Sequence, residues 1–327
     1  MSQLLEIKMS NRLTQLRSMT SVVADTGDMS AIEIYRPDDA TTNPSLVLKQ
    51  AQTADGRTHL AELVAQECVR SNNKQQLLSQ ICDKYTVLLG SQIASIVPGK
   101  ISTEVDARLS FDTDAMVRKG EQLIALYDSY GVAKERVLIK LAATWEGIQA
   151  AIALEKQGIG CNLTLIFSHE QAKACADAGV TLISPFVGRV TDWYKQNTNY
   201  QISQPADDPG VIFVSEIFDT YKSQGYDTII MGASFRNTGQ IAQLAGCDKL
   251  TISPALLREL ESETDSLHKV LDKSAYPPTE KTPMISAGDF RLGVNQNTMA
   301  ADKLSSGIRD FVSHQLELEK IVSSILQ

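Results

Sequence analysis

The sequence predicts an α/β protein that folds as one (β/α)8 barrel, the TIM-barrel architecture. From residue 18 onward, short runs rich in β-branched residues alternate with amphipathic segments, which is the pattern of repeated strand–helix units. Eight strands can be counted, and a barrel of eight such units needs about 250 residues. The rest of the 327-residue chain is expected to form extra helices at both ends, over residues 1–17 and 300–327. Residues 1–327 are therefore predicted to form a single domain.

The predicted strands are segments of three to six residues in which apolar and β-branched side chains dominate. In chain order they are Thr20–Asp25, Ala40–Thr42, Ile101–Asp106, Val137–Ala142, Asn162–Phe167, Thr181–Phe186, Thr228–Ala233 and Leu250–Ser253.

The segments between the strands carry signals for helix starts and ends. Ser168 and Gln171 have the spacing of a capping box, and Gly179 is placed to end the helix that they start. Ser253 is followed by proline, which predicts an N-cap with proline at the first helical position. Strand, cap, helix and glycine thus recur as one unit.

The main alternative is a doubly wound open sheet, because the same alternation would also support that fold. Its nucleotide-binding forms carry GxGxxG after the first strand or the phosphate-binding GxxxxGK[ST] motif. Neither motif occurs in this sequence. The barrel remains the better prediction.

Composition and charge disfavour several classes of function. Thirty-nine acidic and 31 basic residues give a formal net charge of −8, which opposes binding to nucleic acid or to anionic lipid. The longest uncharged stretch, residues 85–99, is too short and too polar to span a bilayer. The first 18 residues lack the apolar segment of a secretory signal, whether translation starts at Met1 or at Met9. We therefore expect a cytoplasmic protein.

Cysteine and histidine usage disfavours disulfide and metal chemistry. The five cysteines include no CxxC pair, so they are expected to be buried, reduced thiols. The four histidines are far apart and none lies in an HExxH motif, so no metal site is expected.

Strand alternation assigns a direction to the polar residues inside the apolar runs. In Val137–Ala142, Lys140 shares a face with Leu138 and is predicted to point into the barrel. The same count directs Glu104 and Asp106 inward. The other polar residues assigned to the interior are Asp25, Ser102, Asn162, Thr164, Ser184 and Ser234. Since barrel enzymes hold their reactive groups at the carboxyl ends of the strands, this set predicts an active site.

Lys140 is the candidate with the clearest chemistry. Most lysines extend their ammonium group to solvent, whereas Lys140 lies among apolar residues of a central strand. Burying an unpaired ammonium is costly, so such a lysine needs a partner or a purpose, and the usual purpose is a Schiff base with a carbonyl substrate. Asp25 and Glu104 would supply the proton transfers that imine formation and C–C cleavage require.

Arg189 and Arg236 follow the sixth and seventh predicted strands, in the segments PFVGR and GASFR. Phosphate sites in barrels commonly lie after the last strands, and a planar guanidinium group matches phosphate bidentately. These arginines are therefore candidates for a phosphate site. The alternative for each is a surface salt bridge.

Eight stretches of several residues match one enzyme family, in that family's order. They are VVADTGD (22–28), DATTNPSL (39–46), ISTEVDAR (101–108), IKLAATWEGI (139–148), NLTLIFS (162–168), ISPFVGR (183–189), DWYK (192–195) and MGASFRN (231–237). Through them the chain resembles the transaldolases of the pentose phosphate pathway, in their longer single-barrel form. The resemblance implies a circularly permuted barrel of the class I aldolase type, with the reactive lysine on the fourth strand.

The resemblance also implies an activity and a role for each candidate residue. The reaction would transfer dihydroxyacetone from sedoheptulose 7-phosphate to glyceraldehyde 3-phosphate, giving erythrose 4-phosphate and fructose 6-phosphate without cofactor or metal. Lys140 would form the Schiff base, Asp25 would take the C4 hydroxyl proton, and Glu104 and Thr164 would hold the water used to make and break the imine. The residues implied to bind substrate are Thr41, Asn43, Asn162, Ser184 and Phe186, with Arg189, Ser234 and Arg236 at the phosphate.

Two other functions are compatible with the same barrel. Fructose 6-phosphate aldolases resemble it but typically carry Tyr where this chain has Phe186 and Gln where it has Glu104, so both positions favour a transaldolase. A catalytically silent barrel that binds sugar phosphates is the second alternative, although such a protein would be expected to have lost Lys140, Asp25 or Glu104. Members of the family are often dimers, so the resemblance also allows a homodimer.

Overall fold

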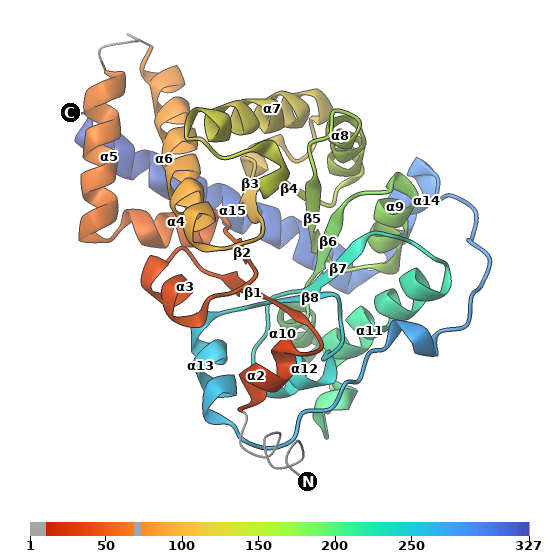
Figure 1. The fold of residues 1–327 in the computed structure, drawn as a ribbon. Helices are drawn as coiled ribbons and strands as arrows, with labels where there is room; N and C mark the ends of the chain where they lie inside the picture. Colours follow the sequence, from red (N-terminus) through yellow and green to blue (C-terminus); the bar gives the residue numbers. More distant parts are fainter. Residues whose placement is uncertain (1–10, 69–72, 327) are drawn as a thin grey trace.

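The computed structural model describes residues 11–68 and 73–326, and eight parallel strands in it close into a barrel (Figure 1). The strands follow one another around the barrel in sequence order, and β1 pairs with both β2 and β8. This confirms the predicted (β/α)8 fold. The strands are β1 Ser21–Asp25, β2 Asp39–Thr41, β3 Ile101–Glu104, β4 Val137–Ala142, β5 Cys161–Ile166, β6 Leu182–Pro185, β7 Ile229–Gly232 and β8 Lys249–Ile252.

Each predicted strand overlaps an observed one, and their ends differ by at most two residues. The largest difference is at β3, which ends at Glu104. The expectation that Asp106 points into the barrel is therefore wrong. Its carboxylate instead accepts a hydrogen bond from the backbone N–H of Arg108 at the start of a short 3₁₀ helix and pairs with the Arg108 guanidinium at 2.5 Å.

Apolar side chains fill the barrel below the predicted site. Val23, Leu138, Leu182 and Met231 form a buried cluster that is separate from the large core between strands and helices. Since side chains alternate along a strand, the residues two positions further on point into the same interior, nearer the carboxyl ends. For Val23, Leu138 and Leu182 those residues are Asp25, Lys140 and Ser184, so the predicted inward direction of these three is confirmed.

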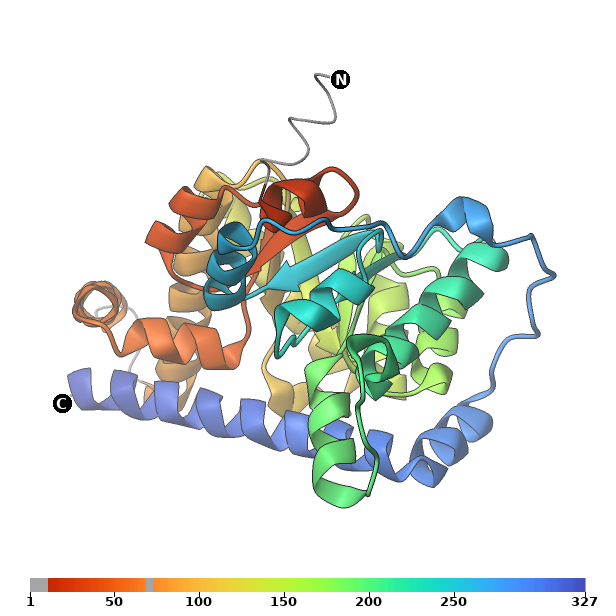
Figure 2. The same ribbon diagram turned by 90° about the horizontal axis from the view of Figure 1, so that it is seen from below.

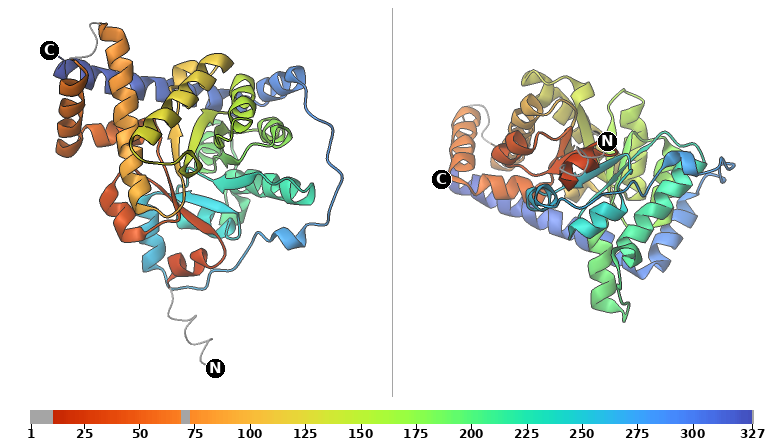
Figure 3. Two further views of the ribbon diagram at one scale, coloured as in Figure 1. Left: turned by 45° about the horizontal axis from the view of Figure 1, so that its top comes forward. Right: turned by 60° about the horizontal axis from the view of Figure 1, so that its bottom comes forward.

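Helices cover the outside of the barrel, as seen from two further directions in Figure 3. The predicted capping box is present at the start of α9, where the Ser168 side chain accepts from the Gln171 N–H, and Gly179 ends that helix with φ +65°. Helix α13 begins at the predicted proline, but the Ser253 side chain makes no capping hydrogen bond. The helices before the last are α2 Arg12–Arg17, α3 Met29–Tyr35, α4 Pro44–Ala51, α5 Ala54–Glu67, α6 Lys74–Ile96, α7 Thr113–Ser129, α8 Trp145–Glu155, α9 His169–Ala178, α10 Gly188–Asn197, α11 Pro209–Ser223, α12 Thr238–Gln243, α13 Pro254–Ser262 and α14 Ala287–Gln296.

The last helix, α15, spans Thr298–Ile325 and runs along one whole side of the molecule, on the side away from α2 (Figure 2). It packs against α4, α6 and α10 and reaches the end of β5. Of the helix predicted for residues 1–17, the first ten residues lie outside the described part, and α2 occupies the remainder. Helix α15 therefore crosses the same end of the barrel as the polar inward residues.

Cys82, Cys161, Cys175 and Cys247 are buried free thiols, as predicted, whereas Cys68 at the end of α5 is exposed. In the described ranges, no helix has both the length and the apolar character needed to cross a membrane.

Candidate active site

A cavity of about 260 Å³ opens at the carboxyl ends of the strands. Predicted site residues make up most of its lining: Asp25, Thr41, Asn43, Lys140, Ser184, Phe186, Arg189, Ser234 and Arg236. The sequence analysis did not assign the remaining lining residues to the site; they are Met231, Ala233, Phe235, Thr251, Ser253 and Phe311. The cavity is thus lined by one carboxyl group, one lysine and two arginines, and the part lined by Arg189 and Arg236 is called the arginine end.

Lys140 lies beside Glu104 because strands β4 and β3 pair these two residues directly. Both side chains are almost fully buried, with 6% and 4% of their surface exposed, and Lys140 Nζ is 3.4 Å from Glu104 Oε2. The Lys140 ammonium also donates a hydrogen bond to the Thr42 carbonyl at 3.3 Å. Burial raises the pKa of Glu104, and the neighbouring Lys140 opposes that rise. Lys140 and Glu104 therefore share a site from which most water is excluded.

Asp25 ends β1 on the other side of the cavity, and β1 pairs it with Thr41 of β2. The Thr41 hydroxyl donates to Asp25 Oδ1 at 3.0 Å. Since its proton is used there, the 2.9 Å contact between the Thr41 and Thr251 hydroxyls is donated by Thr251. Burial raises the pKa of Asp25, while Lys140, the Thr41 hydroxyl and Arg189 act to lower it. Asp25 is thus an acidic side chain in the cavity lining whose pKa is raised mainly by burial.

Asn162 and Ser184 extend the polar network across the barrel interior. The Ser184 hydroxyl donates to Asn162 Oδ1 at 2.6 Å, and Asn162 Nδ2 donates to the Ser102 hydroxyl at 3.1 Å. Ser184 lines the cavity, whereas Asn162 lies behind it. The carboxamide is therefore fixed in orientation by its two neighbours.

Thr164 is fully buried on β5 and also lies behind the cavity lining. Among the described residues, its hydroxyl is a buried polar atom without a hydrogen-bond partner, and Glu104 Oε2 has none apart from its 3.4 Å ion pair with Lys140. Such groups are costly in a protein interior, so they point to a ligand or water that they bind. The next residue, Leu165, has φ +56° at a register shift between β5 and β6, so the strand is bent just beyond Thr164.

The arginine end of the cavity is formed by the first turn of α10 and by the loop after β7. Arg236 Nε and Nη2 bind the Asp192 carboxylate, at 3.1 and 2.7 Å to Oδ2, and Nη1 donates to the Ser234 carbonyl at 3.2 Å. Glycine at position 188 lets the start of α10 lie close to the Ser234 carbonyl, because a Cβ there would be 2.1 Å from that oxygen. Arg189 is mostly buried, which lowers its pKa, and Asp310 opposes that effect. Two guanidinium groups therefore line the same cavity, where they would stabilise an anion.

The comparisons with known proteins agree with this geometry. The family described as transaldolase/fructose-6-phosphate aldolase matches residues 22–322. The chain belongs to this family. A protein named transaldolase from Alteromonas mediterranea is 54% identical over 314 residues, which cover 95% of this chain and 97% of that relative. The chain is therefore similar to a transaldolase over nearly its whole length.

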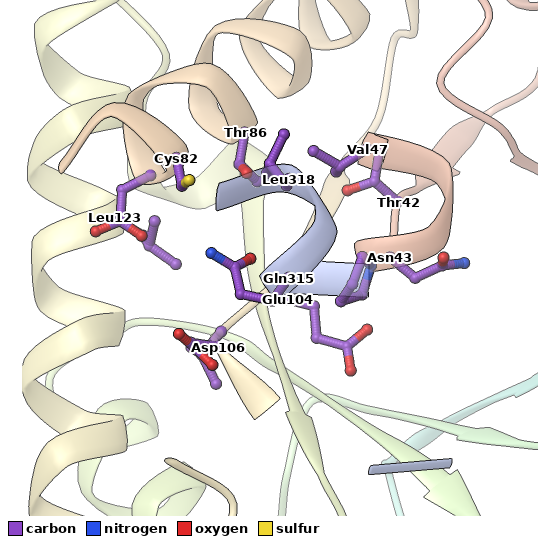
Figure 4. Close-up of a pocket in the computed structure, with 13 residues that line it drawn as sticks. Thr42, Asn43, Val47, Cys82, Thr86, Glu104, Asp106, Leu123, Gln315 and Leu318 are labelled. Atoms are coloured by element: carbon purple, nitrogen blue, oxygen red, sulfur yellow. The ribbon is translucent and has the colours of Figure 1, made fainter. Parts of the chain in front are cut away.

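A second, smaller cavity of about 30 Å³ lies behind Glu104 in this transaldolase-family barrel. Side chains from α4, α6 and α15 surround it (Figure 4), among them Asn43, Thr86 and Gln315. Its volume is enough for about two water molecules. Cys82 also lines it, and burial raises the pKa of that thiol, so it is held as an unreactive, neutral group.

Within the described residues, no group of three or more His, Cys, Asp or Glu side chains is placed to hold a metal ion.

Of the residues that the sequence analysis missed, Thr251 carried a usable signal. Alternation in Leu250–Ser253 places it opposite the apolar Leu250, on the face that points inward. Phe311 carried none, because an apolar residue on the inner face of a helix normally indicates core packing.

Proposed function

We propose that the chain is a class I transaldolase that transfers dihydroxyacetone through a Schiff base on Lys140. The donor would be sedoheptulose 7-phosphate and the acceptor glyceraldehyde 3-phosphate, with erythrose 4-phosphate and fructose 6-phosphate as products. The observation that carries the proposal is the position of Lys140 Nζ. It lies inside a closed barrel, 3.4 Å from Glu104 Oε2, and lines the same cavity as Asp25 and the two arginines.

In the first step, neutral Lys140 Nζ adds to the C2 carbonyl of the ketose, and the resulting carbinolamine loses water to give the imine. Lys140 and Glu104 are adjacent, so a proton can pass between Nζ and this carboxylate as the amine is released for attack. Glu104 Oε2 and Thr164 Oγ1 lack other hydrogen-bond partners, which suits them to hold the water that leaves and later returns.

In the second step, Asp25 takes the proton of the C4 hydroxyl and the C3–C4 bond breaks. The electron pair moves onto C3 and is delocalised into the iminium as an enamine, and the aldehyde fragment leaves. Attack of the enamine on the acceptor aldehyde runs these changes in reverse, with Asp25 returning its proton to the new C4 oxygen. A buried aspartate with a raised pKa is better matched to this exchange near neutral pH than an exposed one.

The remaining lining residues would hold the two ends of the substrate. Asn43 and Ser184 lie beside Lys140, where the dihydroxyacetone hydroxyls would be. The Asn43 Oδ1 atom accepts from the Leu46 N–H as the N-cap of α4, so Nδ2 remains to donate to the sugar. Arg189, Arg236 and Ser234 would bind the phosphate at the opposite end.

Dependence on an acceptor aldehyde tests the proposal against the aldolase alternative. With fructose 6-phosphate alone, a transaldolase retains the dihydroxyacetone unit as an enamine and releases almost no free dihydroxyacetone. Adding erythrose 4-phosphate should then start sustained formation of sedoheptulose 7-phosphate. Fast release of dihydroxyacetone without acceptor would contradict the proposal and favour an aldolase.

A further inference from the structure

Helix α15 forms one wall of the arginine end of the active-site cavity. Its Phe311 is 2% exposed and lines that cavity, although it lies far from the barrel strands in sequence. The Arg189 Cζ atom lies 5.3 Å from the centre of the Phe186 ring and 5.5 Å from the centre of the Phe311 ring. A ring that follows β6 and a ring on α15 therefore both contact the same guanidinium group.

The two arginines of the site are held in different ways. Arg236 is fixed through its N–H groups, which donate to Asp192 and to the Ser234 carbonyl. Within the described residues, no hydrogen bond fixes the Arg189 guanidinium, and its nearest carboxylate, Asp310, is 4.0 Å away and 58% exposed. An exposed ion pair at that distance contributes little. The position of Arg189 therefore depends on the aromatic rings, which leave its N–H donors available.

The backbone of α15 is also shaped to lie against Arg189. A Cβ at Gly307 would be 3.2 Å from Arg189 Nη1 and 2.8 Å from Leu165 Cδ2. Glycine at this position lets the helix contact both the arginine and the bent end of β5. Phe311, one helical turn further on, then lies on the same side of the helix and reaches the guanidinium.

We propose that Phe311 positions Arg189 for the phosphate group of the substrates, so that α15 sets the preference for phosphorylated over unphosphorylated sugars. Rings on a guanidinium group keep water from its faces and restrict its rotamers, while its edges remain free for bidentate bonds to phosphate oxygens. This inference rests on the proposed function, since it assigns a role to Phe311 in binding the transaldolase substrates.

The test compares KM for glyceraldehyde 3-phosphate with KM for unphosphorylated glyceraldehyde, with sedoheptulose 7-phosphate as donor, so that erythrose 4-phosphate is released with either acceptor. For Phe311→Leu we expect KM for the phosphorylated acceptor to rise about 3- to 30-fold, the range of a cation–π contact, and KM for glyceraldehyde to change less than twofold. The matched control is Phe290→Leu, which removes a buried ring from α14 that contacts Trp145 and should change neither KM. If Phe311→Leu does not fold, Phe311→Met provides the same comparison.

A double-mutant cycle with Arg189→Ala distinguishes an effect of Phe311 on the position of Arg189 from an effect on the shape of the cavity. If Phe311 acts through Arg189, Phe311→Leu should have no further effect on KM for glyceraldehyde 3-phosphate in the Arg189→Ala background. Equal effects on both acceptors, or fully multiplicative effects in the cycle, would overturn the inference. A wild-type protein that forms no Schiff base on Lys140 would instead refute the proposed function, so the two failures are distinguishable.

Discussion

Replacing Arg236 with alanine removes the guanidinium group that bridges Asp192 and the predicted phosphate position. In the structure Nε and Nη2 bind Asp192 and Nη1 donates to the Ser234 carbonyl, so one N–H each on Nη1 and Nη2 remains for a ligand. Charge-assisted hydrogen bonds contribute about 1.5–3 kcal/mol each, and the site is partly open to solvent, so we expect a loss of about 2–4 kcal/mol. At about 1.36 kcal/mol per factor of ten, KM for phosphorylated acceptors should rise about 30- to 900-fold.

Asp192, which pairs with Arg236, leads to a second prediction about KM. Once Arg236 is gone, the Asp192 carboxylate, 33% exposed, is left facing the phosphate without its counter-charge. Repulsion between partly exposed charges costs about 1 kcal/mol, so Asp192→Asn should lower KM of the Arg236→Ala variant about fivefold. Steady-state kinetics with glyceraldehyde 3-phosphate and with glyceraldehyde measure both effects. A rise of equal size for the two acceptors would refute the assignment of Arg236 to the phosphate.

Three further predictions concern the buried polar groups. Thr41→Val removes the hydroxyl that donates to Asp25, so the pKa of Asp25 should rise. The acid limb of the pH profile of kcat/KM should then move to higher pH. An acid limb that does not move would exclude Asp25 as the base. Because burial raises the pKa of Asp25, this group stabilises the fold at low pH and the stability is lost as pH rises through the folded pKa. Asp25→Asn should therefore raise the melting temperature at pH 7 but not at pH 3. Turnover should fall about 10²- to 10⁴-fold, because the general base is lost. A lower melting temperature at pH 7 would contradict the raised pKa of Asp25. Gln171→Leu leaves four buried backbone groups without a hydrogen-bond partner, at Phe167, Ser168, Ala143 and Leu165. It should lower the free energy of unfolding, measured by urea titration, by about 3–5 kcal/mol. The control Gln157→Leu changes an exposed residue and should alter that free energy by less than about 0.5 kcal/mol.

The barrel and the inward direction of Asp25, Lys140 and Ser184 could be predicted because they depend on the two-residue period of strands. Other lining residues, Thr41, Asn43 and Phe186, were assigned only through the family resemblance. The position of Lys140 follows from that period alone, since Leu138 lies two residues earlier in the interior cluster. The same rule failed at Asp106, where β3 ends two residues before the apolar pattern does. A strand end depends on pairing with neighbours, which a single segment does not encode.

Other features depend on contacts between distant segments. The bend at Leu165 arises where β5 shifts register against β6, and a leucine gives no local sign of a positive φ. Phe311 reaches Arg189 only because Gly307 brings α15 close to the barrel mouth. From the sequence alone, a phenylalanine in the C-terminal helix is indistinguishable from an ordinary core residue.

The most direct test of the central claim is to trap the covalent intermediate. The protein would be incubated with fructose 6-phosphate, reduced with borohydride, digested and analysed by peptide mass spectrometry, with Lys140→Met as the control. We predict a reduced three-carbon dihydroxyacetone adduct on the peptide that contains Lys140, and no adduct in the control. An adduct on another lysine, or none on any peptide of an active preparation, would contradict the Schiff-base mechanism.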